Sequence, residues 1–324
     1  MKAGHLNRRP GWRIVSVLLC TAILGCSSLI PKQRLSVVPR QTLIPTGRQV
    51  ISIDAINGIP FVQVYVNGQG PYRFVLDTGS TGLMLSPETL DQLDPAPAIV
   101  PIETKLRTTE GEVRAGYCRH VKLIKLGDVE FHDLDAAIAD TRTVFEAYYR
   151  VDGILGIQVF ANCQLTIDYL NNQLVLEALE AIDKAQPLSV KDKSVLPLKR
   201  FPNSRFAIPL RINKQILWCL LDSGHDCGIV VPEEIATTLP LATPPVRLAD
   251  STATLSGRLP VYKARLNSSA FLGSHELTRP VIWVQGNIPL IGGDVLRHFV
   301  VTIDQQAMAA RFVRQLSGPI EPKS

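Results

Sequence analysis

Two acidic residues stand inside apolar runs of the sequence. Asp77 lies in FVLDTGSTGLML (residues 74–85), and Asp222 lies in CLLDSGHDCGIV (residues 219–230). A buried carboxylate is costly unless a partner compensates for its lost hydration. If the chain brings the two turns together, the carboxylates share one proton, because two like charges in close contact do not both ionise readily. The pattern therefore predicts a coupled carboxyl pair.

A carboxyl pair that carries one proton can activate water without a metal or a covalent intermediate. The ionised member removes a proton from water as the oxygen attacks a peptide carbonyl, and the protonated member donates to the carbonyl oxygen. Asp77 and Asp222 are therefore the candidate catalytic residues. No cofactor and no metal are expected, since a zinc site at Cys219, His225 and Cys227 would lack a recognisable ligand spacing.

The neighbours of each aspartate fit a supporting role. Thr78 and Ser223 supply hydroxyls that can bond across a twofold axis and lock the two turns together. Gly79 and Gly224 lack a Cβ, which lets the turns approach and lets backbone N–H groups reach the carboxylates. The hydroxyl of Ser80 can support the outer carboxylate oxygen of the first turn.

The fourth position of the second turn is His225, where the first turn has a serine. A protonated imidazole near Asp222 would favour two ionised carboxylates and remove the shared proton. Three interpretations remain open. The imidazole is turned to solvent or bonded to Asp226, it senses pH, or the site is altered and inactive.

The sequence contains an internal duplication. A shift of 145 aligns residues 74–90 with 219–235 and places Pro87 on Pro232, each predicted to open a short helix. A shift of 136 aligns residues 153–168 with 289–304. Duplication at this spacing predicts two similar halves and not a solenoid, whose repeats are far shorter.

Each half also carries an apolar-apolar-Gly triplet downstream of its aspartate, which ends at Gly156 or Gly292. The triplets are expected to pass a buried strand beneath each turn, with glycine where two backbones approach closely. Turn-rich segments between the blocks, 106–117 and 247–258, predict two hairpins.

These features resemble the aspartic proteases of the pepsin and retropepsin clan. DTGS at 77–80, DSG at 222–224 and the two triplets match the family pattern, and NGQGPYRFVLDTGS resembles bacterial retropepsin-like domains. The resemblance implies a mainly β, bilobal, pepsin-like acid protease fold, in which two pseudo-symmetric retropepsin-like β-barrel lobes flank an interlobe cleft. It also implies an extended peptide substrate, an acidic pH optimum and hairpins that close over the substrate as flaps. Tyr117 is a weak candidate for the flap tyrosine of the family.

Period-2 alternation between turn signals supports a mainly β protein and sets the expected domains. Their predicted limits are a signal peptide at 1–25, a tether at 26–49, an N-terminal lobe at 50–176, an inter-lobe linker at 177–205, a C-terminal lobe at 206–314 and a tail at 315–324.

The N-terminus has the pattern of an export signal. Four basic residues lie within the first 13 positions, before the apolar stretch 14–24, and ILGC ends in Cys26, which resembles a bacterial lipobox. We expect acylation of Cys26 and attachment to a membrane on the periplasmic side, and Ser27 mildly favours the outer membrane. A signal cut elsewhere and an uncleaved anchor are the alternatives.

The net charge gives no indication of nucleic-acid binding. Four of the 34 basic residues and none of the 29 acidic residues lie in the first 25 positions, so the remainder carries 30 basic and 29 acidic residues. Four cysteines remain beyond the lipobox, and their pairing or freedom is left open by the sequence: Cys118, Cys163, Cys219 and Cys227.

The leading hypothesis is a monomeric, exported, lipid-anchored aspartic endopeptidase. Two alternatives remain. The first is a catalytically silent peptide-binding module on the same fold, because of His225. The second is a homodimer in which Asp77 of two chains meet, against which the internal duplication argues.

Overall fold

The structure is a computed structural model of the chain. It describes residues 35–107, 112–141, 145, 151–182, 188–189, 191–254, 257–314 and 320. The expected mainly β class is confirmed, since the strands fall into three sheets and the helices are few and short. The helical segments are α1 (Pro87–Gln92), η2 (Ile157–Phe160), η3 (Pro202–Ser204), α3 (Glu233–Ala236) and α4 (Gly293–Leu296).

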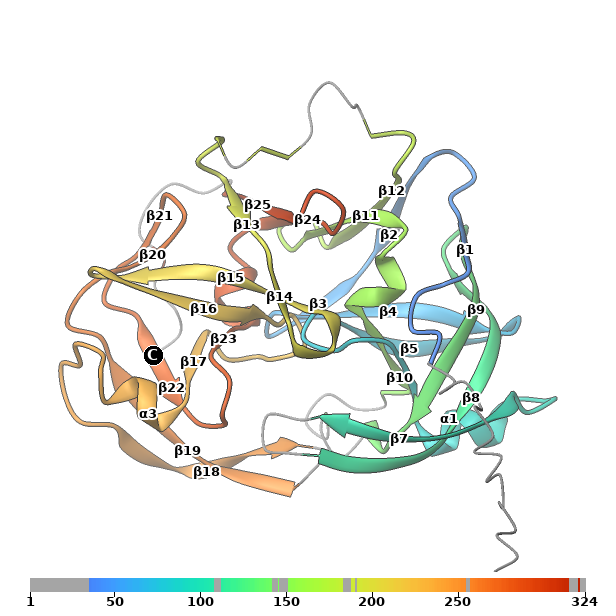
Figure 1. The fold of residues 1–324 in the computed structure, drawn as a ribbon, viewed down its shortest axis with the longest axis horizontal. Helices are drawn as coiled ribbons and strands as arrows, with labels where there is room; N and C mark the ends of the chain where they lie inside the picture. Colours follow the sequence, from blue (N-terminus) through green and yellow to red (C-terminus); the bar gives the residue numbers. More distant parts are fainter. Residues whose placement is uncertain are drawn as a thin grey trace, which may run out of the picture. The chain divides into compact units, whose positions relative to one another are not determined.

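The first sheet has nine strands and contains a closed ring (Figure 1). Its strands are β1 (Gln41–Leu43), β3 (Asp54–Ile56), β4 (Ile59–Val66), β5 (Gln69–Asp77), β6 (Leu83–Leu85), β7 (Ala98–Arg107), β8 (Glu112–Leu126), β9 (Val129–Ile138) and β10 (Gly153–Gly156). Hydrogen bonds join β4 to β5, β5 to β10, β10 to β6, β6 to β9, β9 to β8, and β8 back to β4. These six strands form a closed barrel.

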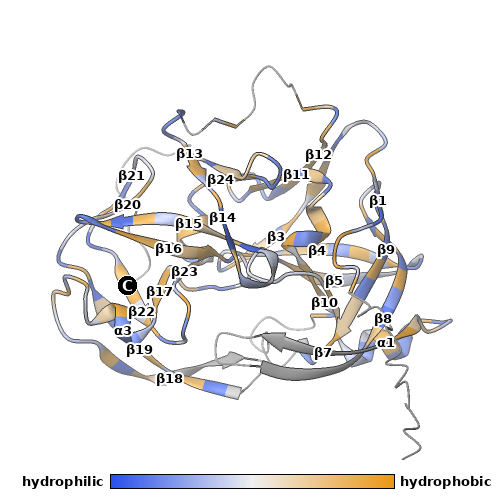
Figure 2. Cartoon of the chain, in the orientation of Figure 1, coloured by the Kyte–Doolittle hydropathy of each residue, from blue (hydrophilic) through white to orange (hydrophobic). Residues whose placement is uncertain are grey.

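Local sequence explains how this barrel forms. Asn67 and Gly68, with φ of 50° and 82°, form the two-residue turn between β4 and β5, as an Asn-Gly pair favours. Buried and less buried residues alternate along β9, and Figure 2 shows hydrophobic and hydrophilic stretches along the strands. Phe74 and Phe131, both fully buried, fill the interior.

The sheet of the second half has ten strands in a related order. Its strands are β14 (Lys199–Phe201), β15 (Arg205–Ile212), β16 (Gln215–Leu221), β17 (Ile229–Val231), β18 (Val246–Thr254), β19 (Gly257–Arg265), β20 (Ala270–Leu272), β21 (His275–Leu277), β22 (Val281–Val284) and β23 (Leu290–Ile291). The run β15–β16–β23–β17–β22–β19 repeats β4–β5–β10–β6–β9–β8. Within the described residues no pairing closes β19 onto β15, so this second ring stays open.

A six-stranded sheet joins the two halves. Its strands are β2 (Arg48–Ser52), β11 (Cys163–Asp168), β12 (Gln173–Ala178), β13 (Val195–Pro197), β24 (Val300–Asp304) and β25 (Ala309–Val313). The central strands β11 and β24 are antiparallel, and Thr166 lies opposite Thr302 with 2.9 Å between their hydroxyl oxygens. These residues are 136 positions apart, which is the predicted shift, so a local twofold axis passes between them.

The predicted helix starts are confirmed in one half and corrected by one residue in the other. Pro87 occupies the first turn of α1, after the N-cap Ser86, whose hydroxyl oxygen accepts the N–H of Thr89 at 3.1 Å. In the second half Pro232 is the N-cap itself and α3 begins at Glu233. Proline fits both positions because neither needs a backbone donor.

Segment 177–205, predicted as a linker from its charges and prolines, contains two short strands. β13 pairs with β25, and β14 pairs with β15, so the connection adds strands to two sheets. The predicted hairpins are present as β7–β8 and β18–β19, while their tips, 108–111 and 255–256, lie outside the described residues. The side chain of Tyr117 is also outside them.

None of the four cysteines that the sequence left open, all of them described residues, is part of a disulfide. A bridge between Cys219 and Cys227 is therefore excluded. Cys118, Cys163 and Cys219 are buried, and burial raises the pKa of Cys163 to about 12, which keeps its thiol neutral. Cys26 and the whole predicted signal lie outside the described residues, within which no helix is both long and apolar enough to cross a bilayer.

Gly58 and Gly293 bring the two halves into backbone contact. A Cβ on Gly293 would lie 2.6 Å from the carbonyl carbon of Gly58 and would overlap its oxygen. Both residues are buried, and the obstructing atoms are backbone atoms that cannot rotate away.

Gly293→Ala is therefore expected to lower the free energy of unfolding by about 1–3 kcal/mol, the usual cost of overpacking. Chemical denaturation measures the change, with the exposed Gln306→Ala as the control. An unchanged or raised midpoint for Gly293→Ala would contradict the contact.

Candidate active site

The two aspartates stand at corresponding strand ends. Asp77 is the last residue of β5 and lies opposite Gly156 in the parallel pair β5–β10. Asp222 directly follows β16, and its N–H donates to the carbonyl oxygen of Ile291 in β23 at 3.0 Å. Parallel pairing beside each aspartate therefore fixes both turns in the same way.

Four hydrogen bonds interlock the two turns. The N–H of Thr78 donates to Oγ of Ser223, and the N–H of Ser223 donates to Oγ1 of Thr78, both at 3.0 Å. The hydroxyl of Thr78 donates to the carbonyl oxygen of Leu221, and the hydroxyl of Ser223 donates to that of Leu76, both at 2.7 Å. Each bond has a mate 145 residues away, so the bonds obey the predicted shift. Both hydroxyl residues are buried, which strengthens these bonds.

The interlock brings the carboxyl groups together. A Cβ on Gly79 would lie 2.6 Å from both carboxyl oxygens of Asp222, and a Cβ on Gly224 would lie 2.7 Å and 2.8 Å from those of Asp77. Each glycine thus leaves the space that the other turn's carboxyl group fills. The two carboxyl groups therefore lie close together, and burial and the neighbouring Asp77 charge raise the pKa of Asp222, which favours a pair that carries one proton.

The two carboxyl groups have unequal support. Asp77 accepts three hydrogen bonds, from the N–H of Gly79 at 2.8 Å, the N–H of Ser80 at 3.2 Å and the hydroxyl of Ser80. Asp222 accepts one from the turn, from the N–H of Gly224 at 3.1 Å. Burial first, and then the Asp77 charge and the hydrogen bond to it, raise the pKa of Asp222 well above its usual value. The shared proton therefore belongs on Asp222.

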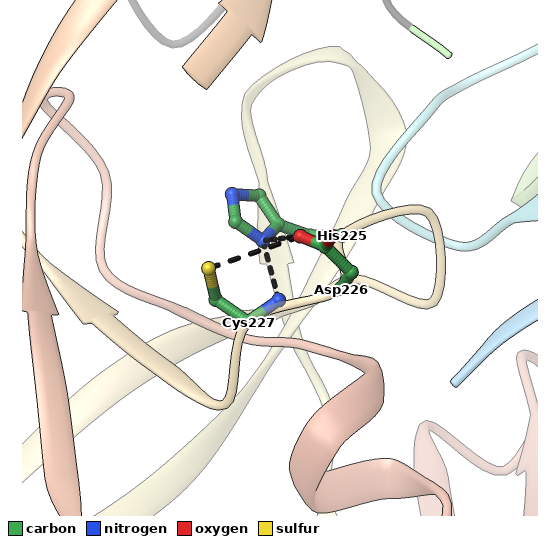
Figure 3. A group of neighbouring side chains, drawn as sticks. All are labelled: His225, Asp226 and Cys227. Atoms are coloured by element: carbon green, nitrogen blue, oxygen red, sulfur yellow. Dashed lines mark hydrogen bonds and ion pairs between the residues drawn. The ribbon is translucent and has the colours of Figure 1, made fainter. Parts of the chain in front are cut away.

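His225 contributes no donor to Asp222 and braces its own loop instead (Figure 3). Its Nδ1 accepts the N–H of Cys227 at 3.1 Å, and its Nε2 lies 3.1 Å from the side-chain nitrogen of Gln285. The imidazole is not turned to solvent, since its side chain is 17% exposed, and Asp226 lies 3.9 Å from Nδ1. A nitrogen that accepts a hydrogen bond carries no proton, so this geometry holds the neutral form.

His225, Asp226 and Cys227 also offer a nitrogen, an oxygen and a sulfur, all within 4.8 Å of one another. A metal ion would need the Nδ1 lone pair, which already accepts the amide of Cys227. Burial and the Asp226 charge raise the pKa of the Cys227 thiol, so the thiolate that would bind zinc is disfavoured. Cys219 lies apart from this group, in β16, with its thiol bonded to the carbonyl of Leu217. The loop is better described as a hydrogen-bonded turn than as a metal cradle.

The two triplet glycines lie against the loops that follow the aspartates. A Cβ on Gly156 would lie 2.5–2.6 Å from the backbone of Thr81 and Gly82. A Cβ on Gly292 would lie 2.6 Å from the carbonyl oxygen of His225 and would overlap that of Cys227. These contacts are to backbone atoms, so glycine is required at both positions.

Two residues that the sequence analysis did not single out also face the pair. Arg205, the first residue of β15, is 7% exposed, and its Nη1 donates to the carbonyl oxygen of Gly79 at 3.4 Å. Tyr169 is buried, and burial followed by the charges of Asp222 and Asp77 raises the pKa of its phenol, which therefore stays neutral. The sequence does contain a feature that could have identified Arg205, because this charged residue begins the otherwise apolar segment RFAIPL.

Comparison with protein families places this geometry in a known context. Residues 62–159 match a family model described as aspartyl protease. A comparison of the chain with curated proteins gives no match. The matched segment runs from β4 through Asp77 and its turn to η2, and it includes Gly156. The match supports a relationship of this segment to retropepsin-like aspartyl proteases.

Proposed function

We propose that the protein is an aspartic endopeptidase in which Asp77 and Asp222 form the catalytic pair. The observation that carries the proposal is the interlock of the two turns, which holds the two carboxyl groups close together. The family match over residues 62–159 supports peptidase chemistry, although it covers the first aspartate only. The second comes from the duplicated half.

The unequal support of the two carboxyl groups assigns their roles. Asp77, with three donors, is the base and removes a proton from water as the water oxygen bonds to the peptide carbonyl carbon. Asp222, which holds the shared proton, donates it to the carbonyl oxygen. In the second step the tetrahedral diol returns a proton to Asp222, the C–N bond breaks, and Asp77 protonates the leaving amine. The products are a carboxylic acid and an amine, and both side chains return to their first state.

The substrate of such a pair is an extended peptide. We propose that the two halves act as lobes, with the cleft between them at the aspartate turns. Figure 1 draws the hairpins β7–β8 and β18–β19 along the same lower side of the view. Long hairpins of this kind can close over a peptide and pair with its backbone. Because one chain supplies both turns, a monomer suffices, and a homodimer through Asp77 is unnecessary.

Replacement of either aspartate is expected to abolish cleavage. Asp77→Asn and Asp222→Asn each remove one proton-transfer group, so kcat/KM should fall on the order of 10²–10⁴-fold. The assay is the digestion of a mixed-peptide substrate by residues 27–324 between pH 3 and 7. The control is Asp226→Asn, the same substitution at a residue four positions after Asp222. Peptide binding without cleavage by the wild type would instead support a silent binding module.

The position of His225 predicts the upper limit of the pH range. Activity should fall as pH rises through the raised pKa of Asp222, because the pair then loses its proton. His225→Ser places a hydroxyl where the first turn has Ser80, and a donor to the ionised form lowers a carboxyl pKa.

The upper limb of the kcat/KM profile should therefore shift to lower pH in His225→Ser. His225→Ala also removes the imidazole but adds no donor, so it serves as the matched control for damage to the loop. An equal shift in both variants, or a shift of His225→Ser to higher pH, would exclude this account of the asymmetry.

We further propose export and lipid anchoring through Cys26, which the lipobox-like ILGC supports. Acyl chains hold a protein at a membrane surface when more than one is attached. Cys26→Ser is expected to move the protein from the membrane fraction to the soluble fraction. Cys20→Ser, inside the apolar stretch, is the control and should leave the distribution unchanged. Retention of Cys26→Ser with the membranes would rule out this anchor.

A further inference from the structure

Arg205 places a buried positive charge beside the aspartate pair. It is the first residue of β15, and only 7% of its surface is exposed. Its Nη1 donates to the carbonyl oxygen of Gly79 at 3.4 Å, and its Nε donates to that of Pro202 at 3.2 Å. Gly79 is the residue whose missing Cβ makes room for the Asp222 carboxyl group. The guanidinium therefore contacts the same turn that carries Asp77.

No carboxylate among the described residues neutralises the charge of Arg205 through an ion pair. Its two hydrogen bonds go to carbonyl oxygens, which orient a guanidinium without neutralising it. Burial lowers the pKa of Arg205, and the charges of Asp222 and Asp77 oppose this effect, but a guanidinium stays protonated in proteins. Among the described residues, the charges that act on Arg205 are those of the pair, which carries one negative charge when it holds one proton.

The fold does not require a charge at this position. β15 repeats β4, and the first residue of β4 is Ile59, which is 2% exposed. Both strands are eight residues long and pair with the strand that leads to an aspartate. The equivalent position in the first half is therefore occupied by a buried, uncharged isoleucine. A buried charge that architecture does not demand, and that is only partly compensated, is costly and needs another reason.

We propose that Arg205 binds a carboxylate of the substrate next to the scissile bond, so that the enzyme selects acidic peptides. The inference rests on the proposed peptidase function and adds a substrate class to it. The planar guanidinium suits a carboxylate because it can offer two parallel N–H donors. Arg205 and Asp77 are similarly buried, with 7% and 8% of their surfaces exposed, and the hydrogen bond to Gly79 places the guanidinium at the Asp77 turn.

The carboxylate has two sources, a side chain of Asp or Glu and the C-terminus of a peptide. An extended peptide advances about 3.3 Å per residue, so a side chain within about two or three residues of the cut would reach the guanidinium. Both sources must be ionised to bind. The preference should therefore weaken as pH falls below about 4, the ordinary range of these carboxyl groups.

The test compares the wild type, Arg205→Met and Arg205→Lys, with Arg211→Met as the matched control. Arg211 lies on the same strand, is exposed and stacks on Phe271 at 4.1 Å, away from the pair. Each protein digests a proteome-derived peptide library at pH 5.5, and residues near the new termini are counted. The hit sequences are then made in four forms, with Glu or Gln at the selected position and with a free or amidated C-terminus.

The wild type and Arg211→Met should cleave the Glu form about 10- to 100-fold better than the Gln form, as expected for a hydrogen bond to a charged group. Arg205→Met should lose this ratio by losing activity on the Glu form alone, and Arg205→Lys should keep part of it. If the free and amidated termini differ instead, the carboxylate is the C-terminus. Equal losses on all four forms would mean that Arg205 only braces Gly79, and would overturn the proposal.

Failure of the proposed function is a separate outcome. If the wild type cleaves nothing, fluorescence anisotropy with labelled poly-Glu and poly-Gln peptides of equal length still reports on Arg205. Tighter binding of the Glu peptide by the wild type, reduced in Arg205→Met and retained in Arg211→Met, would support the carboxylate site without catalysis. Equal binding of both peptides would exclude it.

Discussion

The exchange of hydrogen bonds between Thr78 and Ser223 is the constraint on which the site depends. Each residue gives its amide to the other's hydroxyl, and each hydroxyl passes its own hydrogen to a carbonyl of the opposite half. No donor or acceptor in this set is left over, so the bonds are satisfied only when both turns are present. Two carboxyl groups that would repel each other if both were ionised are thereby held close together, because their backbones are tied to each other at the two turns.

Because the two halves are nearly symmetric around the aspartates, the positions at which their side chains differ stand out. The backbone around each aspartate is equivalent, yet Ser80 adds a hydroxyl on one side and His225 adds none on the other. Arg205 replaces the apolar residue that stands at the same place in the first half. Neither departure alters the strands that carry the pair. The two halves thus keep an equivalent backbone, while single side chains make the surroundings of the two carboxyl groups unequal.

Much of this arrangement could be predicted from the sequence, for a physical reason. Asp77, Asp222 and their glycines sit in short motifs whose backbone geometry is local, and the shifts of 145 and 136 carried the symmetry into the pairings Thr78–Ser223 and Thr166–Thr302. The bond from Cys227 to His225 depends on the path of a loop, and Arg205 reaches Gly79 across 126 positions. Side-chain directions over such separations are set by packing. The open second ring likewise depends on the distance between β15 and β19, which no motif encodes.

The pairing of β11 with β24 has a consequence for the first half as a separate molecule. A polypeptide that ended after β12 would leave β11 as an uncovered edge, whose amides and carbonyls lack partners. A second copy of the same fragment offers the same strand in the opposite direction, with Thr166 facing itself in the register that Thr302 now occupies. Proteolytic loss of the second half would thus leave a self-complementary strand edge on the remaining fragment. Two copies of this fragment would be expected to pair through β11 and form a dimer.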